Sequence, residues 1–88
     1  MGSSNVNGSN SFGSGFNNIV NGESSGSIGF GNIVEGNYST AFGGLNKIKG
    51  DGCFAGGTYN NISGSDSTTF GDFGIITADQ SLVEGGYN

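Results

Sequence analysis

The chain has 88 residues, of which 32% are hydrophobic and 10% are charged, and its net charge is −5. This length allows at most one domain, residues 1–88, and an isolated globule of this polarity would struggle to bury a sufficient core. Two basic residues argue against a nucleic-acid ligand, and one cysteine allows no internal disulfide framework. The sequence shows neither a membrane-spanning apolar run nor a signal-peptide core, so we expect no membrane insertion and interpret the chain as a segment of a longer protein.

Glycine recurs every seven residues. When the sequence is written in rows of fourteen, starting at residues 1, 15, 29, 43, 57, 71 and 85, glycine fills 11 of the 13 slots at row positions one and eight. The exceptions are Met1 and Ala78. Random placement would fill 13 × 20/88, or about 3, of these slots, so the pattern indicates a structural repeat and not a flexible linker.

Each row predicts two short β-strands separated by glycine turns. Asparagine recurs at position four, Val or Ile at six, serine at eleven and a small residue at thirteen, alternating with outward positions as in strands. In chain order the strands are expected around 4–6, 11–13, 18–20, 25–27, 32–34, 39–41, 46–48, 53–55, 60–62, 67–69, 74–76 and 81–83. So many glycines disfavour helices.

The constant shift of fourteen residues favours stacking of parallel strands. Asn-Gly pairs at 7–8 and 21–22 would signal hairpins in isolation, but every column moves by one whole row. Coils stacked at ~4.8 Å would form a rod ~29 Å long over six steps. The predicted fold is therefore all-β, a parallel β-solenoid with 14-residue coils of two short strands.

A thin core is expected between positions six and thirteen. The position-six column comprises Val6, Val20, Val34, Ile48, Ile62 and Ile76, and the small column opposite it includes Ala41 and Ala55. The Asn and Ser columns are expected to form hydrogen-bonded ladders beside the turns. Cys53 occupies a serine position, so a buried substitute for serine is favoured over a reactive thiol.

Two outward zones carry one large apolar residue per coil. At positions twelve and fourteen these are Phe12, Ile28, Phe42, Phe54, Phe70 and Leu82; at positions two and three they are Phe16, Phe30, Leu45, Tyr59, Phe73 and Tyr87. A monomer should not expose so large an apolar stripe. We therefore expect these residues to form an oligomer interface around an axis, in preference to a strip on which a ligand stacks. The other outward positions are mainly polar.

The motif G-x-x-N-x-[VI]-x-G-x-x-S-x-A-x-G, seen best from Gly43 to Gly57, resembles the head repeats of YadA-like trimeric autotransporter adhesins. This resemblance implies a left-handed parallel β-roll and a side-by-side homotrimer. It also implies a cell-surface location, in the extracellular part of a Gram-negative outer-membrane protein that binds host matrix proteins or cells. Related repeats in phage and viral fibres leave a virion fibre as the alternative. Gly74, Ala78 and Cys53 depart from the motif without breaking its period.

The residues that enzymes require are mostly absent. Without histidine there is no Ser–His or Cys–His pair and no histidine metal site, and the sequence has no P-loop. The acidic residues of the second turn are expected to form a solvated edge in preference to a calcium site: Glu23, Asp51, Asp66 and Asp79. We expect no enzyme activity, no metal and no cofactor. The N-x-S sequons at Asn7, Asn37 and Asn61 are interpreted as coincidences of the columns.

Three functions fit a rigid rod of this kind. An adhesive head is favoured, with its polar outward columns contacting the partner through many weak interactions. A purely structural spacer in a fibre is the alternative. An ice-binding solenoid is disfavoured, because no outward column is uniformly threonine: Thr40 and Thr68 alternate with Phe12, Gly26, Phe54 and Leu82.

Overall fold

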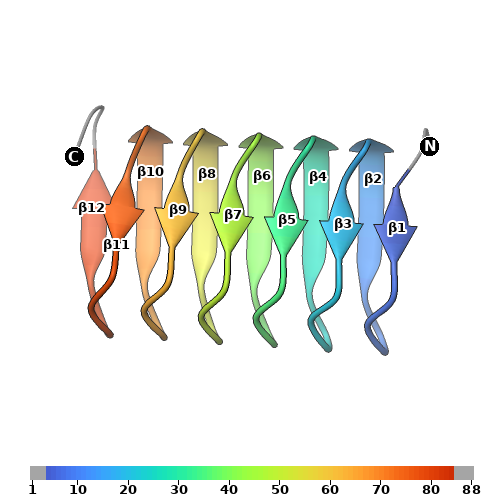
Figure 1. The fold of residues 1–88 in the computed structure, drawn as a ribbon, viewed down its shortest axis with the longest axis horizontal. Helices are drawn as coiled ribbons and strands as arrows, with labels where there is room; N and C mark the ends of the chain where they lie inside the picture. Colours follow the sequence, from blue (N-terminus) through green and yellow to red (C-terminus); the bar gives the residue numbers. More distant parts are fainter. Residues whose placement is uncertain (1–3, 85–88) are drawn as a thin grey trace.

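The computed structural model describes residues 4–84, which form β-strands joined by short turns (Figure 1). Two-residue and longer strands alternate along the chain. Their bounds are β1 Asn5–Val6, β2 Phe12–Phe16, β3 Ile19–Val20, β4 Gly26–Phe30, β5 Ile33–Val34, β6 Thr40–Gly44, β7 Lys47–Ile48, β8 Phe54–Thr58, β9 Asn61–Ile62, β10 Thr68–Asp72, β11 Ile75–Ile76 and β12 Leu82–Glu84.

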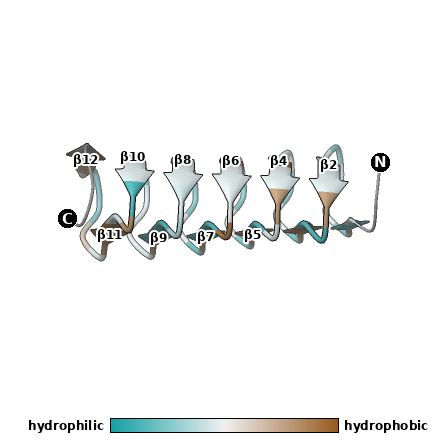
Figure 2. Ribbon diagram, turned by 90° about the horizontal axis from the view of Figure 1, so that it is seen from above, coloured by the Kyte–Doolittle hydropathy of each residue, from teal (hydrophilic) through white to brown (hydrophobic). Residues whose placement is uncertain are grey.

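The strands form two parallel sheets, which lie as two layers in Figure 2. The short strands make one sheet in the order β1-β3-β5-β7-β9-β11, and the longer strands make the other in the order β12-β10-β8-β6-β4-β2. Each residue pairs with the residue fourteen positions away, as Thr40 does with Phe54 and Ile48 with Ile62. The predicted parallel β-solenoid with 14-residue coils is confirmed. The expected turn at position one is wrong, because the longer strands continue through that glycine, as β6 does through Gly43.

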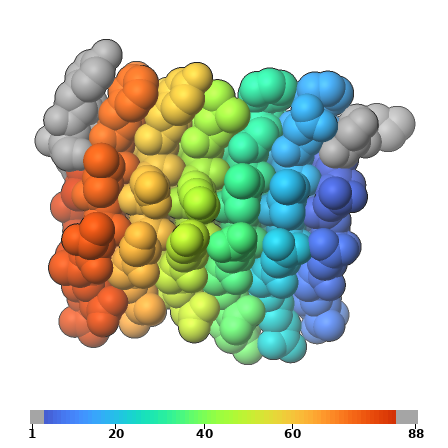
Figure 3. All heavy atoms as spheres, in the orientation of Figure 1, coloured from blue at the N-terminus to red at the C-terminus, as the bar shows by residue number. Residues whose placement is uncertain are grey.

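The coils advance along one straight axis. In Figure 1 the chain descends through the near sheet and rises through the far sheet while it moves from right to left, which is a left-handed path. The molecule measures 30 × 20 × 11 Å along its principal axes, in agreement with the expected rod length. Figure 3 shows the coils stacked side by side with no gap between them.

The core is one residue wide on each side. At position six, the fully buried side chains are Val20, Val34, Ile48 and Ile62, and Ile76 is 3% exposed. Ala41 and Ala55 are fully buried at position thirteen of the opposite sheet. Val6 departs from the expected burial, because 38% of its surface is exposed. Its coil is the first described, so the described chain packs against it from one side only.

The glycine columns are required because neighbouring coils approach closely. At position eight, a Cβ on Gly50 would lie 2.0 Å from the carbonyl oxygen of Gly64 in the next coil. At position one, a Cβ on Gly43 would lie equally close to the oxygen of Gly57, and Gly43 also has a positive φ of 115°. Any side chain at these positions would therefore push the coils apart.

Positions three and ten adopt the left-handed backbone conformation regardless of residue type. Leu45, Tyr59 and Phe73 have φ of 57–59° at position three, and Tyr38 has φ of 56° at position ten. Bulky residues rarely adopt this conformation, which carries strain. We infer that coil stacking imposes the turn geometry and that each residue type must accept it.

Candidate interaction surface

A buried ladder of asparagines lies inside the turn that follows the longer strands. The Nδ2 group of Asn32, Asn46 and Asn60 donates to Oδ1 of the preceding asparagine at 3.0–3.2 Å, beginning at Asn18. The backbone N–H of the same residues donates to that oxygen as well. These side chains are at most 1% exposed, so the ladder holds the base of the turn rigidly.

The ladder ends at Gly74, and the structure shows why asparagine is absent there. A Cβ on Gly74 would lie 2.2 Å from Oγ1 of Thr69, which occupies the small column opposite. The larger Thr69 therefore fills space that the side chain of an asparagine would need. The N–H of Gly74 still donates to Oδ1 of Asn60 at 2.7 Å.

The serine column forms a second ladder, beside the polar turn. The hydroxyl of Ser39 donates to the carbonyl of Gly50 at 2.9 Å and accepts from the N–H of Cys53 at 3.0 Å. Cys53 takes the serine place: its thiol is buried and donates to the carbonyl of Gly64 at 3.0 Å. Burial raises the pKa of this thiol above its ordinary 9.0, while hydrogen bonds with the backbone of Ser67 and Asp66 lower it in part.

The outer surface of the longer-strand sheet is apolar. We call the outward residues at positions twelve and fourteen the face strip; its large members are Phe12, Ile28, Phe42, Phe54, Phe70 and Leu82. Five of the six are 41–62% exposed, and Phe54 is half-buried between its neighbours. The ring centroids of Phe42 and Phe54 are 5.4 Å apart, and those of Phe54 and Phe70 are 5.5 Å apart. These three rings thus form a continuous ridge across three neighbouring coils.

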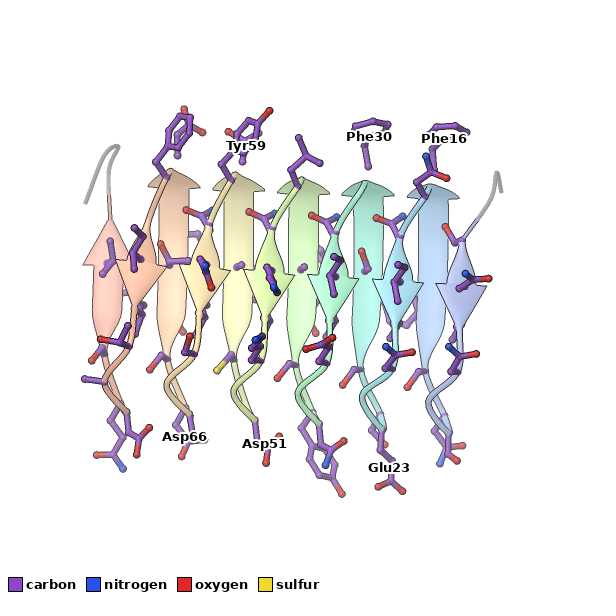
Figure 4. All side chains as sticks on the ribbon, in the orientation of Figure 1. Phe16, Glu23, Phe30, Asp51, Tyr59 and Asp66 are labelled. Carbon is purple, nitrogen blue, oxygen red and sulfur yellow. The ribbon has the colours of Figure 1, made fainter. Side chains whose placement is uncertain are left out.

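A second apolar zone follows the turn at the end of the longer strands. We call it the edge strip; its described members are Phe16, Phe30, Leu45, Tyr59 and Phe73, and they are 40–52% exposed. Two pairs of rings are stacked, Phe16 with Phe30 at 5.7 Å and Tyr59 with Phe73 at 5.0 Å. Figure 4 shows Phe16, Phe30 and Tyr59 projecting beyond the same end of the strands. Tyr87 was expected here too but lies outside the described residues.

One polar contact of the edge strip was not expected from the sequence. The hydroxyl of Thr58 donates to Oδ1 of Asp72 on the next coil at 2.7 Å. The two residues pair across β8 and β10, so the one-row shift of the columns already placed them side by side. The repeat therefore predicts that Thr58 and Asp72 are neighbours, but only the structure shows that they form a hydrogen bond.

The opposite turn is polar. Figure 4 places Glu23, Asp51 and Asp66 there, at the end of the molecule away from the edge strip. Oδ1 of Asp51 accepts from the N–H of Asn37 at 2.9 Å, so this carboxylate also supports the turn. Tyr38 is the exception in this zone: its aromatic side chain is 70% exposed among polar residues.

The outer surface of the short-strand sheet is mixed. Its exposed residues at position seven are Asn7, Asn21, Glu35, Lys49, Ser63 and Thr77. Position five adds Ile19, Ile33 and Lys47, which are half-buried, and Asn61 and Ile75, which are exposed. The asparagines of the three sequons, Asn7, Asn37 and Asn61, are all exposed. This surface and the polar turn offer many separate polar groups without one dominant cluster.

Residues 4–84 contain no pocket, and no three acidic or cysteine side chains among them gather where they could hold a metal ion. No helix in this part of the chain is long and apolar enough to cross a membrane. Comparison with models of known protein families gave no match, and comparison with curated proteins gave none either. The candidate site is accordingly a surface, formed by the face strip and the edge strip.

Proposed function

We propose that this chain is the head module of a cell-surface adhesin, in which three copies pack side by side and present their polar surfaces to a partner. The observation that carries the proposal is the exposure of large apolar side chains along one face and one edge of the rod. Isolated exposed hydrophobic residues are common on soluble proteins, but a continuous stripe of this kind marks an interface.

The energy available from covering the two strips is large. Full burial of one large apolar side chain contributes about 1.5–3 kcal/mol, so a half-exposed one has about 0.75–1.5 kcal/mol left to gain. For the eleven described side chains this amounts to about 8–16 kcal/mol per chain, as an upper estimate. That gain equals the typical net stability of a folded domain, ~5–15 kcal/mol. Association therefore accounts for most of the stability that we expect this thin rod to have.

The polar surfaces remain for the partner. The short-strand face and the polar turn expose Asn, Ser, Thr, Lys and acidic side chains at regular intervals. Weak contacts gain avidity when three copies present them together. The resemblance to adhesin head repeats points to host matrix proteins or cell-surface ligands as partners, and to a location on the cell surface.

The proposal is tested with the purified chain and a Phe42→Asp variant, which places a charge in the face strip. We expect native trimers in sedimentation analysis, binding of these trimers to immobilised matrix proteins or cells, and loss of both properties in the variant. A folded native monomer at micromolar concentration would contradict the proposal. A stable trimer that binds none of these surfaces would instead favour a structural spacer of a surface or virion fibre.

A further inference from the structure

We propose that Gly74 and Ala78 close the last described coil against a further coil of the same geometry. The excluded occupant is a solenoid coil, in particular the first coil of a second copy placed end to end. The inference goes beyond the proposed function, because it concerns the end of the rod and not its two apolar strips.

The end of a solenoid is an open edge of two sheets. β11 and β12 stand at the ends of their sheets, at the left of Figure 1, and each pairs with one neighbour among the described strands. Unpaired N–H and C=O groups on such an edge are a template on which another strand can pair. A stack of similar coils is especially prone to this, because each coil is shaped to receive the next one.

Position eight sets how closely two coils can stack. A Cβ added there would lie 1.8–2.0 Å from the position-eight carbonyl oxygen of the next coil, at each of Gly8, Gly22, Gly36, Gly50 and Gly64. Because real Cβ atoms keep at least 3.0 Å from such an atom, a side chain would need about 1 Å more space. Beside this contact the N–H of position seven donates to the next coil at 2.7–2.8 Å, and a lengthening of about 1 Å would break that bond.

Ala78 places a methyl group at this position in the last described coil. The fifth coil still stacks on it in the usual way, because the glycine of that coil, Gly64, faces the carbonyl of Ala78. By the repeat of the coils, the Cβ of Ala78 occupies the place where the carbonyl oxygen of a following coil would lie. Ala78 is exposed, whereas the glycines from Gly22 to Gly64 in this column are buried. Alanine thus occurs where no described coil covers it.

Gly74 removes a second means of attachment. In the asparagine ladder, Nδ2 of Asn60 donates to the carbonyl of Gly71, and its Oδ1 accepts from the N–H of Gly74, both in the following coil. Asn46 makes the same two bonds with Gly57 and Asn60. Gly74 has no side chain, so a following coil would find neither partner and would leave a carbonyl and an N–H unpaired. The two changes flank β11, so the same edge strand is altered at both of its ends.

Closing one end is sufficient to prevent axial growth. In a head-to-tail joint the C-terminal end of one rod meets the N-terminal end of another, and repetition of that joint gives an open filament. Every such joint includes one C-terminal end, so the N-terminal coil can keep glycine at position eight, as Gly8 shows. Atypical terminal repeats serve as caps in other solenoids. The closed end leaves lateral association through the two strips unaffected.

The first test compares position eight inside the stack and at its end, in the full chain. Gly50→Ala places a methyl group between two stacked coils and should lower the urea midpoint by about 1 M or more, or abolish folding. Ala78→Gly removes the methyl group at the closed end and should shift the midpoint several-fold less. If Gly50→Ala is as stable as the native chain, alanine is compatible with stacking and the inference is wrong.

The second test builds the excluded joint into one polypeptide. In a tandem chain, residues 1–84 are followed directly by residues 15–84, which preserves the fourteen-residue period. A restored tandem carries in its first copy the residues that other coils have in these columns: Thr69→Ala, Gly74→Asn, Ala78→Gly and Val83→Ala. Thr69→Ala is included because Oγ1 of Thr69 occupies the space that an asparagine at position 74 needs. Val83→Ala gives the same space to the asparagine of the next coil.

The native tandem should unfold in urea as two uncoupled rods, with the midpoint of the single chain. The restored tandem should unfold at higher urea and with a steeper slope, up to about twofold, because more surface is exposed in one step. Equal midpoints and slopes for the two tandems would overturn the inference, and so would end-to-end filaments of the native chain in electron microscopy. Neither result affects the proposed adhesin head, which fails instead if the native rods do not associate laterally.

Discussion

Two adjacent asparagines, Asn60 and Asn61, provide a test of what holds the coils together. Asn60 is 1% exposed, and its Nδ2 group donates to Oδ1 of Asn46 and to the carbonyls of Gly56 and Gly71 at 2.9–3.0 Å. Its Oδ1 accepts from the N–H of Gly74 at 2.7 Å. Asn61 is exposed, and its backbone pairs in the short-strand sheet whichever side chain it carries.

Asn60→Ala should strongly destabilise the fold. It removes the partner of the buried N–H of Gly74, and an orphaned buried group costs about 1–3 kcal/mol. It also removes hydrogen bonds to the part-buried carbonyls of Gly56 and Gly71, each of which contributes about 0.5–1.5 kcal/mol. Some of these groups relax toward other partners, so we expect a total loss of about 3–6 kcal/mol. Asn61→Ala leaves no buried group unpaired and should change the free energy of unfolding by less than about 0.5 kcal/mol.

The assay is urea unfolding followed by circular dichroism, with both variants at one protein concentration because an assembling chain gains stability by mass action. The midpoint of Asn61→Ala should coincide with that of the native chain, whereas Asn60→Ala should unfold at much lower urea or fail to fold. Equal midpoints for the two variants would refute the view that the buried ladder is a main source of stability.

Two further predictions concern single side chains of the core and the serine ladder. The buried hydroxyl of Ser27 has no hydrogen-bond partner, so Ser27→Ala should raise the free energy of unfolding by about 1 kcal/mol in the same urea assay. Ser39→Ala orphans the N–H of Cys53 and the carbonyl of Gly50, so it should lower the free energy of unfolding by about 2 kcal/mol. The opposite order of the two variants would contradict the assignment of the two columns. The raised pKa of Cys53 means that the unfolded thiol ionises first, so the native chain should lose stability as the pH rises above about 9 and a Cys53→Ser variant should lose less. Identical pH profiles of the two proteins would show that this thiol is not protected by the fold.

The coil, its two sheets and its core could be read from the sequence because stacking turns a repeat into a geometric constraint. Every residue must suit a neighbour fourteen positions away, so Val20, Val34 and Ile48 must all be apolar if one of them is buried. Glycine at position eight follows from the same constraint, since the carbonyl of the next coil occupies the place of its Cβ. A period therefore fixed the register without knowledge of any single contact.

The turns were less predictable. A left-handed backbone at position three would ordinarily call for Gly or Asn, as at Gly31 and Asn17, yet Leu45 and Tyr59 adopt it too. Local propensity favours another conformation for these two residues, and the hydrogen bonds of the stack overrule it. The N–H of Tyr59, for example, donates to the carbonyl of Gly44 on the preceding coil at 3.0 Å.

The packing of Thr69 against Gly74 could not be predicted by inspecting each column of the repeat separately. Gly74 is an exception in its column, whereas Thr69 is only larger than the residues that precede it in its own column. Nothing in the sequence links them, because Thr69 lies in β10 and Gly74 comes just before β11 of the other sheet. Only the packing shows that one fills the space left by the other. Exceptions that pair across the core are thus invisible until both columns are placed face to face.

The outward residues obey different rules from the interior ones, and for the proposed adhesin head this difference indicates where partner specificity would reside. An interior column tolerates few changes, because each change disturbs two neighbouring coils. Outward side chains such as Lys49 and Tyr38 differ from the residues that precede and follow them in their columns, and the fold does not demand them there. Tyr38 is especially informative, since it is 70% exposed and holds a left-handed backbone that would suit glycine better. Because the fold gives no reason for an exposed aromatic side chain there, we expect partner contacts on the polar turn of the proposed adhesin head to concentrate around Tyr38.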